Sequence, residues 1–237
     1  MTIDSPDRPE TSAPAAHLHA NHADTDASSL AALFRTLGNL KRIRRTGWVD
    51  RGVPRDEVES VADHSFLSTI IAWVVASDNT ALDADRVLKM ALIHDLAEAT
   101  FGDAPPYEPG DVPDRADVDA VRTFFSINHV RSAGNAADKR IGEDAAMAEL
   151  LAPMPDRLRD EMAGLWAEYE AQETPEARFV KEVDRLEAFL EARHLEDAHP
   201  GLPLAGFTIM AERQIDDPAL TAIRDAARST GADGNGG

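Results

Sequence analysis

The sequence predicts an all-α globule without a β-sheet, and three observations support this prediction. Apolar residues recur at spacings of three and four along most of the chain, beginning with Leu30, Leu33, Phe34 and Leu37. Strict alternation of apolar and polar residues, which is typical of half-buried strands, is nearly absent. Hydrophobic residues make up 43% of the 237 residues. This share is enough for a sizeable core, and the length suggests one domain or at most two.

The ends of the chain differ in composition from the part between them. Residues 1–27 are rich in Ser, Thr, Pro, Ala, Asp and His and lack apolar periodicity, so we predict a disordered tail there. Residues 28–230 form the predicted folded domain, and residues 231–237 form a second disordered end. The tail lacks a basic segment followed by an apolar one, which argues against a secretory signal.

The predicted tail carries three histidines at short spacing, His17, His19 and His22. Such a tract is compatible with metal binding and also with an ordinary solvated tail. We favour the solvated tail, because the surrounding residues are those of a disordered segment.

The helical pattern resolves into successive elements. Residues 61–77 form a strongly apolar helix candidate. Asp83 is positioned to cap the next helix, whose end we expect at Gly102. The buried side of that helix is predicted to carry Val87, Met90, Ala91 and Ile93. Further helices are expected over about 114–131, 138–152, 156–172, 175–197 and 218–229.

The part of the chain after Gly102 has a different character. Residues 103–110 are rich in proline and acidic residues and are predicted to form a loop. Residues 111–137 have weaker periodicity and are predicted to be an inserted segment. This insert is either an extra helix or a lid over a functional site.

Charge and cysteine content exclude several classes of function. The net charge of −19 and the pI of about 4.7 argue against binding of a nucleic acid polymer through a broad basic surface. No apolar run approaches the roughly 20 residues of a membrane span. The chain has no cysteine, which excludes disulfide scaffolds, zinc fingers, iron–sulfur clusters and thiol nucleophiles. It also fits a cytoplasmic location.

Four ionisable residues stand at positions that we expect to face inward on three helices: His64, His94, Asp95 and Asp184. Singly, each is more often a structural residue than a ligand, and only the set indicates a metal site. Buried carboxylates are costly unless a cation compensates them. Two imidazoles and two carboxylates form a mixed set that Mn, Co, Fe and Zn accept, and it leaves positions for water and substrate.

The geometry of a helix constrains how these residues can meet. Adjacent residues point about 100° apart on a helix, so His94 and Asp95 can reach one ion only from a rim or a kinked end. Glu98 follows His94 by one turn on the same face. Its carboxylate is therefore placed to polarise a water molecule or to pass a proton.

Basic residues gather in the segment before His64, in an otherwise acidic chain. A solvated loop explains most of them, but we expect Arg45 to contact a phosphate, because its planar guanidinium matches phosphate oxygens. Nearby Trp48 either packs on a sugar or anchors the loop. The basic residues are Lys41, Arg42, Arg44, Arg45, Arg51 and Arg55.

The motifs carry a specific resemblance. The sequences around residues 40–48, 59–64, 91–98, 102–105, 165–170 and 177–184 together resemble the HD-domain metal-dependent phosphohydrolases. Within that family they are most similar to the 5′-deoxynucleotidase branch, which removes phosphate from deoxynucleoside 5′-monophosphates. The resemblance covers about residues 30–225, apart from the insert.

The resemblance implies an all-α HD-domain fold and a role for each residue of the set. It implies that His64, His94, Asp95 and Asp184 bind one divalent ion, for which we favour cobalt or manganese over iron, magnesium and zinc. It further implies that Glu98 handles the attacking water and that Asp103 and Arg45 line the nucleotide site, with Asp103 also expected to take part in catalysis and Trp48 to lie beside the substrate. The expected substrate is a (deoxy)nucleoside monophosphate or a nucleotide analogue, and the expected assembly is a homodimer.

Other functions remain open at this stage. The di-iron oxygenases and cyclic-nucleotide phosphodiesterases with an HD core need additional histidines between the HD pair and the last aspartate. Here only His129 lies between Asp95 and Asp184, which favours a mononuclear site. A non-catalytic nucleotide-binding protein is a third alternative, and the presence of Glu98 and all four ligands argues against it.

Overall fold

A computed structural model describes residues 27–229 of the chain. The predicted tail up to residue 26, with its three histidines, and the predicted end 231–237 lie outside the described residues. Within residues 27–229 there are helices and no strand, and a single isolated bridge joins Arg44 to Ser60. The prediction of an all-α fold is confirmed. The α-helices are α1 (Ala27–Leu37), α2 (Thr46–Asp50), α3 (Val61–Ala76), α4 (Ala84–Ile93), α5 (Glu98–Phe101), α6 (Val118–Phe124), α7 (Ala133–Leu151), α8 (Asp156–Ala171), α9 (Pro175–Ala198), α10 (Ala205–Gln214) and α11 (Pro218–Ser229), and the 3₁₀ turns are η1 (Gly38–Lys41) and η2 (Pro109–Asp111).

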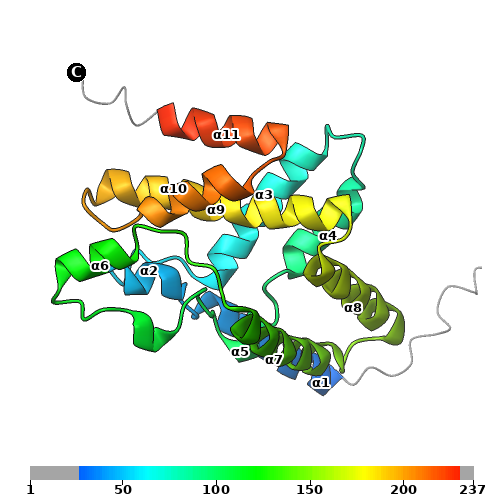
Figure 1. The fold of residues 1–237 in the computed structure, drawn as a ribbon. Helices are drawn as coiled ribbons and strands as arrows, with labels where there is room; N and C mark the ends of the chain where they lie inside the picture. The colour runs from blue at the N-terminus through cyan, green and yellow to red at the C-terminus, as the bar shows by residue number, and fades with distance from the viewer. Residues whose placement is uncertain (1–26, 230–237) are drawn as a thin grey trace, which may run out of the picture.

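Helix α9 is the centre of the arrangement. It packs against α3, α4, α8, α10 and α11, and the last two run beside it at the top of Figure 1. Helices α5 and α7 pack together on the lower side of the molecule, next to α1. Because α9 contacts so many helices, a side chain in its middle can meet groups from α3 and α4.

The main core surrounds α9 and is made of aliphatic and aromatic side chains. Val183, Leu186 and Phe189 of α9 are fully buried and pack with Val87 and Met90 of α4. The predicted buried side of α4 is confirmed, since Val87, Met90, Ala91 and Ile93 are all buried. This rigid core fixes the position of polar residues on the same helices.

Local sequence signals determine where the helices begin. Ser60 and Asp63 form a capping box at the start of α3, in which each side chain accepts from the other residue's backbone N–H. Asp83 caps α4, as predicted, by accepting from the backbone N–H of Arg86 at 3.1 Å. Thr174 caps α9, and Pro175 occupies its first position.

The predicted helix ending at Gly102 is interrupted. Helix α4 ends at Ile93, residues 94–97 form a turn, and α5 is a separate short helix. Gly102 ends α5 with a φ of +88°, a conformation that glycine adopts without steric cost. The interruption turns His94 and Asp95 toward the interior together, which a straight helix would not allow.

The insert 111–137 contains less helix than predicted. In place of a helix over 114–131, only α6 forms, and the chain after it runs without regular structure to α7. Helix α7 begins before the expected residue 138, because Ser132 caps it by accepting from the backbone N–H of Asn135. Helix α10 was not expected. Its sequence has weak apolar periodicity, and it is held by packing against α9.

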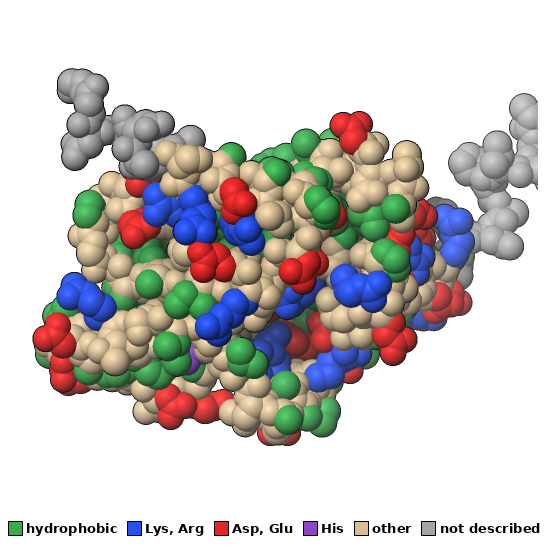
Figure 2. All heavy atoms as spheres, turned by 45° about the horizontal axis from the view of Figure 1, so that its top comes forward, with side chains coloured by type: hydrophobic (Ala, Val, Ile, Leu, Met, Phe, Trp, Pro, Cys, Tyr) green, Lys and Arg blue, Asp and Glu red, His purple; other side chains and the backbone are tan. Residues whose placement is uncertain are grey.

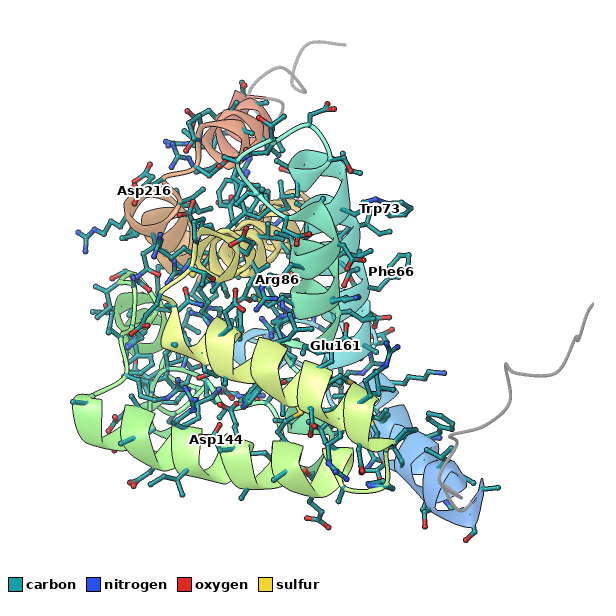
Figure 3. The ribbon with its side chains drawn as sticks, turned by 90° about the vertical axis from the view of Figure 1, so that its right-hand side faces the viewer. Phe66, Trp73, Arg86, Asp144, Glu161 and Asp216 are labelled. Atoms are coloured by element: carbon teal, nitrogen blue, oxygen red, sulfur yellow. The ribbon has the colours of Figure 1, made fainter. Side chains whose placement is uncertain are left out.

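Helix α3 exposes large apolar side chains. Phe66 is 68% exposed and Trp73 is 54% exposed, and both point away from the body of the molecule in Figure 3. The buried side of the same helix carries smaller residues, among them Ser68, Ala72 and Ala76, together with His64. A helix that is apolar on all sides normally has neighbours on all sides.

The surface in Figure 2 carries no broad basic area. Lys and Arg side chains lie among Asp and Glu side chains over this face, in keeping with the net charge of −19. Among the described helices, none combines the length and the apolar character that crossing a bilayer requires.

Candidate metal centre

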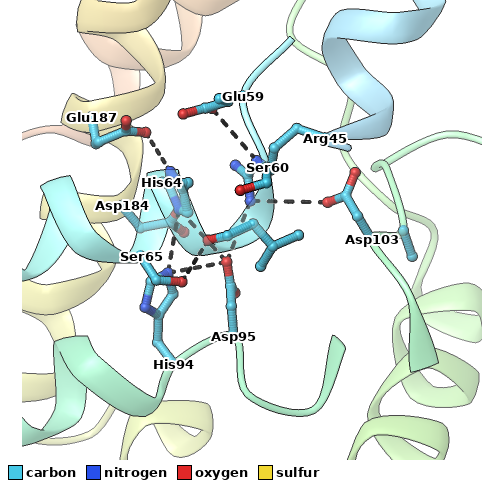
Figure 4. Close-up of polar contacts among 12 residues, drawn as sticks. Arg45, Glu59, Ser60, His64, Ser65, His94, Asp95, Asp103, Asp184 and Glu187 are labelled. Atoms are coloured by element: carbon cyan, nitrogen blue, oxygen red, sulfur yellow. Dashed lines mark hydrogen bonds and ion pairs between the residues drawn. The ribbon is translucent and has the colours of Figure 1, made fainter. Parts of the chain in front are cut away.

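Three parts of the fold bring the predicted ligands together. His64 lies in the first turns of α3, His94 and Asp95 lie in the turn between α4 and α5, and Asp184 lies in the middle of α9. Their side chains converge (Figure 4). Ligand atoms of His64, His94 and Asp184 all lie within 4.8 Å of one another, and Asp95 joins them through its contacts with both histidines. The structure therefore assembles the four residues that the sequence analysis singled out.

The distances between their polar atoms suit a single ion. Nε2 of His64 lies 3.3 Å from Nε2 of His94 and 3.2 Å from Oδ1 of Asp184. Oδ2 of Asp95 lies 3.2 Å from Nε2 of His94 and 3.6 Å from Nε2 of His64. Ligand bonds of about 2.1 Å place neighbouring donor atoms about 3.0–3.5 Å apart around one ion. The donor set fits a divalent metal.

Both imidazoles are held with Nε2 free for coordination. His64 donates from Nδ1 to the carboxylate of Glu187, which is 1% exposed. His94 donates from Nδ1 to the backbone carbonyl of Ala91 at 2.7 Å. A histidine that donates from one ring nitrogen presents the other as a lone pair, which is the usual state of a metal ligand.

The negative charges of the cluster are also best balanced by a cation. Burial by itself would raise the pKa of Asp184, but Lys181 and His64 outweigh it and hold this pKa well below its usual range. Burial and Arg45 oppose protonation of His64, yet Asp184 and Glu187 raise its pKa to about 10. Without an ion, a proton on His64 therefore balances the carboxylates, and a bound metal would take its place.

Glu98 lies beside the cluster and is 5% exposed. Its Oε2 is buried and has no hydrogen-bond partner among the described residues. Burial, together with Asp95 and Asp103, raises the pKa of Glu98 well above its usual range. A buried carboxyl oxygen without a partner is costly. A water molecule or substrate group in the adjacent cavity would satisfy it.

Arg45 and Asp103 form the edge of the site. Nη1 of Arg45 donates to Oδ2 of Asp95 at 3.3 Å and lies 3.9 Å from Oδ1 of Asp103 (Figure 4). The carboxylate of Asp103 also accepts from the backbone N–H of Thr46 at the start of α2. Asp103 thus holds the loop that carries Arg45, and both side chains line the cavity described next.

A cavity of about 400 Å³ opens in front of the cluster. Its wall includes Asp95, Glu98 and Asp184 from the metal centre. It also includes residues 127–131 of the insert, and α10 contributes Phe207 and Met210. This volume is within the range of small-molecule sites in proteins.

Trp48 is placed as an anchor of this wall. It is 1% exposed, and its indole N–H donates to Oε1 of Glu59 at 2.8 Å. Its ring stacks on Phe207 with a centroid distance of 4.3 Å. Trp48 lines the cavity, but its indole N–H is already bonded to Glu59 and one face of its ring is already covered by Phe207.

Three important residues were not singled out from the sequence. Glu187 orients His64, Glu59 holds Trp48, and Nζ of Lys181 donates to Oδ2 of Asp184 at 2.8 Å. Glu187 and Lys181 each lie three residues from Asp184 on helix α9, which places them on the same face as Asp184. This spacing of three residues was the sequence signal that could have identified them.

Comparison with known proteins agrees with this geometry. A family model described as HD domain matches residues 37–219 of the chain. The chain belongs to the HD-domain family. Among its relatives, the human 5′-deoxynucleotidase HDDC2 is 36% identical over 171 residues, which are 72% of this chain and 70% of that protein. The zebrafish protein of the same name is 32% identical over 197 residues, 82% of this chain and 84% of that protein.

Solved structures share the HD-domain arrangement. A conserved hypothetical protein from Pyrococcus furiosus is 27% identical, with a TM-score of 0.59, and the match covers 84% of this chain and 99% of that one. The match extends far beyond the His-Asp pair. The likeness is therefore one of the whole fold.

Proposed function

We propose that this HD-domain protein is a metal-dependent phosphomonoesterase that removes the 5′-phosphate from deoxynucleoside monophosphates or a close analogue. One observation carries the proposal: ligand atoms of His64, His94 and Asp184 converge, and Asp95 contacts both histidines. They lie at a cavity whose wall also includes Glu98, a residue with a buried carboxyl oxygen that has no partner among the described residues. The names of the relatives support the substrate class, since they are called 5′-deoxynucleotidases.

Each residue has a distinct task in this proposal. His64, His94, Asp95 and Asp184 hold one divalent ion, for which we favour cobalt or manganese. When bound, such an ion neutralises charge on phosphoryl oxygens and lowers the pKa of water. The carboxyl group of Glu98 orients the attacking water and exchanges a proton with it.

Two positively charged side chains lie at the end of the cavity where the phosphate would bind. Arg45 lies against Asp95, and Lys181 lies against Asp184, so both positive charges border the metal centre. Burial alone would lower the pKa of Lys181, but Asp184 and Tyr169 raise it well above its usual range, so the side chain stays charged. Charges already fixed in place stabilise a phosphoryl transition state without reorganisation. Asp103 positions Arg45, and Trp48 holds the wall beside the sugar.

The alternatives have less support. His129, the histidine that a second metal would need, donates from Nε2 to the carbonyl of Phe124 at 2.8 Å and lies outside the His64–His94 cluster. The small cavity and the acidic chain favour a free nucleotide over a nucleic acid polymer. The absence of cysteine fits a cytoplasmic enzyme.

We also propose that the chain forms a homodimer through the exposed side of α3. This side carries Phe66 and Trp73, and no ionisable residue lies between the buried His64 and Asp78. In a chain with a net charge of −19, a second copy can cover this surface without bringing like charges together. Light scattering should give a dimer for the wild type and a monomer for Trp73→Glu. A dimer with Trp73→Glu, or a monomeric wild type, would overturn this assembly, and Leu158→Glu on α8 is the control.

Phosphate release tests the enzymatic proposal. The metal-loaded protein should hydrolyse deoxynucleoside 5′-monophosphates and leave di- and triphosphates largely intact. Glu98→Gln should retain the ion and lose about 10²–10⁴-fold in kcat. Arg45→Ala should chiefly weaken substrate binding and raise KM. Absence of phosphate release from every nucleotide would refute the proposal.

A further inference from the structure

The stretch of chain between α6 and α7, residues 125–131, borders the cavity, and we refer to it as the strap. Its residues Ile127, Asn128, His129, Val130 and Arg131 all line the cavity, whose wall also carries residues of the metal centre. Most polar groups at the metal end already bond one another. The strap differs, because it presents polar groups that lack partners.

The strap is fixed at both ends. At its start, the carbonyl of Phe125 accepts from the backbone N–H of Gly206 at 3.2 Å. At its end, Nη2 of Arg131 donates to the carbonyls of Ala104 and Pro105 at 2.7 and 2.6 Å. Side chains between these two attachments therefore hold defined positions over the cavity.

His129 is held with one ring nitrogen free. Its Nε2 donates to the carbonyl of Phe124, because a carbonyl can only accept. Its ring lies 4.2 Å from the ring of Phe124 and 5.2 Å from that of Tyr107, measured between centroids. In the neutral ring this arrangement makes Nδ1 an acceptor, and no described residue bonds to it.

Asn128 is the second free group. It is half-buried in the cavity wall, and its amide has no hydrogen-bond partner among residues 27–229. An asparagine amide offers a donor and an acceptor side by side, which matches the edge of a nucleobase.

The cavity offers a base little aromatic surface on which to stack. Phe207 has Trp48 stacked on it, and the guanidinium of Arg51 lies 4.5 Å from its centroid. Arg51 in turn lies 4.1 Å from the ring of Phe125. Because these ring faces are already covered, discrimination between bases depends on hydrogen bonds to the edge of the base.

We propose that Asn128 and His129 bind the nucleobase and determine which base the enzyme accepts. This inference rests on the proposed function, since the phosphate must occupy the metal end for the base to reach the strap. The amide of Asn128 pairs with a donor and acceptor on one edge of the base, and Nδ1 of His129 accepts from a ring or exocyclic N–H.

The test compares nucleotides with deoxyribose 5-phosphate, which has no base. Loss of one hydrogen bond of about 0.5–1.5 kcal/mol predicts that Asn128→Ala lowers kcat/KM for the preferred nucleotide about 2- to 13-fold. The value for deoxyribose 5-phosphate should not change. Asn79→Ala, in the loop between α3 and α4, is the matched control and should affect neither substrate.

A second variant detects a change of preference. Asn128→Asp removes the donor and keeps an acceptor. It should therefore shift the ratio of kcat/KM toward adenine and cytosine, which carry an amine at C6 and C4, over guanine and thymine, which carry a carbonyl at those positions. Unchanged ratios among the bases, or an equal loss on deoxyribose 5-phosphate, would overturn the inference and leave the proposed function standing. Absence of hydrolysis of every substrate by the wild type would instead overturn the proposed function and this inference with it.

Discussion

His64 donates from Nδ1 to the carboxylate of Glu187, and the two residues come from different helices, α3 and α9. This bond leaves Nε2 of His64 pointing at His94 and Asp184. A carboxylate behind a ligating histidine fixes the ring and makes it a better ligand. Glu187 is therefore a positioning residue for the metal centre.

Replacement of Glu187 should weaken metal binding without removing a ligand. We expect Glu187→Ala to lower the affinity for the ion about 10- to 100-fold, because His64 loses the partner that orients it. Calorimetric titration of metal into the metal-free protein measures this change. Glu191→Ala, one turn further along α9, is the control and should bind metal as the wild type does. Equal affinity for Glu187→Ala and wild type would show that the pair does not support the site.

Gly206 tests the attachment of the strap. A Cβ at this position would lie 2.5 Å from the carbonyl oxygen of Ile127 and 3.0 Å from that of Phe125, which are backbone atoms that cannot yield easily. Gly206→Ala should lower the free energy of unfolding by about 1–3 kcal/mol. Gly164→Ala is the matched control, since nothing lies within 4 Å of its Cβ, and it should raise stability by about 0.5–1 kcal/mol. Urea denaturation compares them, and a fully stable Gly206→Ala would contradict the close packing.

The contact between Arg86 and Glu168 predicts a pH dependence of stability. Nε of Arg86 donates to Oε1 of Glu168 at 3.0 Å, and Thr174 donates to the same oxygen at 2.7 Å. The hydrogen bonds from Arg86 are the main cause that lowers the pKa of Glu168 below its ordinary value. A group whose pKa is lower in the folded state stabilises the fold above its unfolded pKa of about 4.3, and this contribution is lost as pH falls through the folded value.

Glu168→Gln should therefore destabilise the protein at pH 7 by about 1 kcal/mol and leave its stability unchanged in strong acid. Thermal melts of wild type and variant at a series of pH values measure the difference. Glu173→Gln, an exposed glutamate five residues later, should show no such difference at any pH. A constant gap between Glu168→Gln and the wild type down to strong acid would contradict the assignment.

Much of the fold was predictable because its helices carry strong local signals. The capping side chain of Asp83 and the buried face of α4 follow directly from spacing and residue type. The adjacency of His94 and Asp95 left two possibilities, a rim or a kinked helix end, and the structure has a turn at that point. Ligand residues can be predicted where an ionisable residue interrupts an otherwise apolar face of a helix.

The remaining features depend on contacts between distant segments. The path of the strap follows from the bonds of Phe125 and Arg131 to other parts of the chain, and its own sequence has no periodicity. Helix α10 forms where α9 offers a packing surface. Glu187 resembles any other glutamate of α9 in sequence, and only the fold shows that its carboxylate meets His64. Such relationships are tertiary, and local patterns do not contain them.

The central claim is that one ion, held by His64, His94, Asp95 and Asp184, is required for phosphate release. The most direct test measures metal content and hydrolysis of a deoxynucleoside monophosphate in the same preparation of Asp184→Ala. Bound metal and turnover should disappear together while the helical circular dichroism signal persists. A folded Asp184→Ala protein with full metal content and wild-type turnover would show that this ion is not held by Asp184 or is not required.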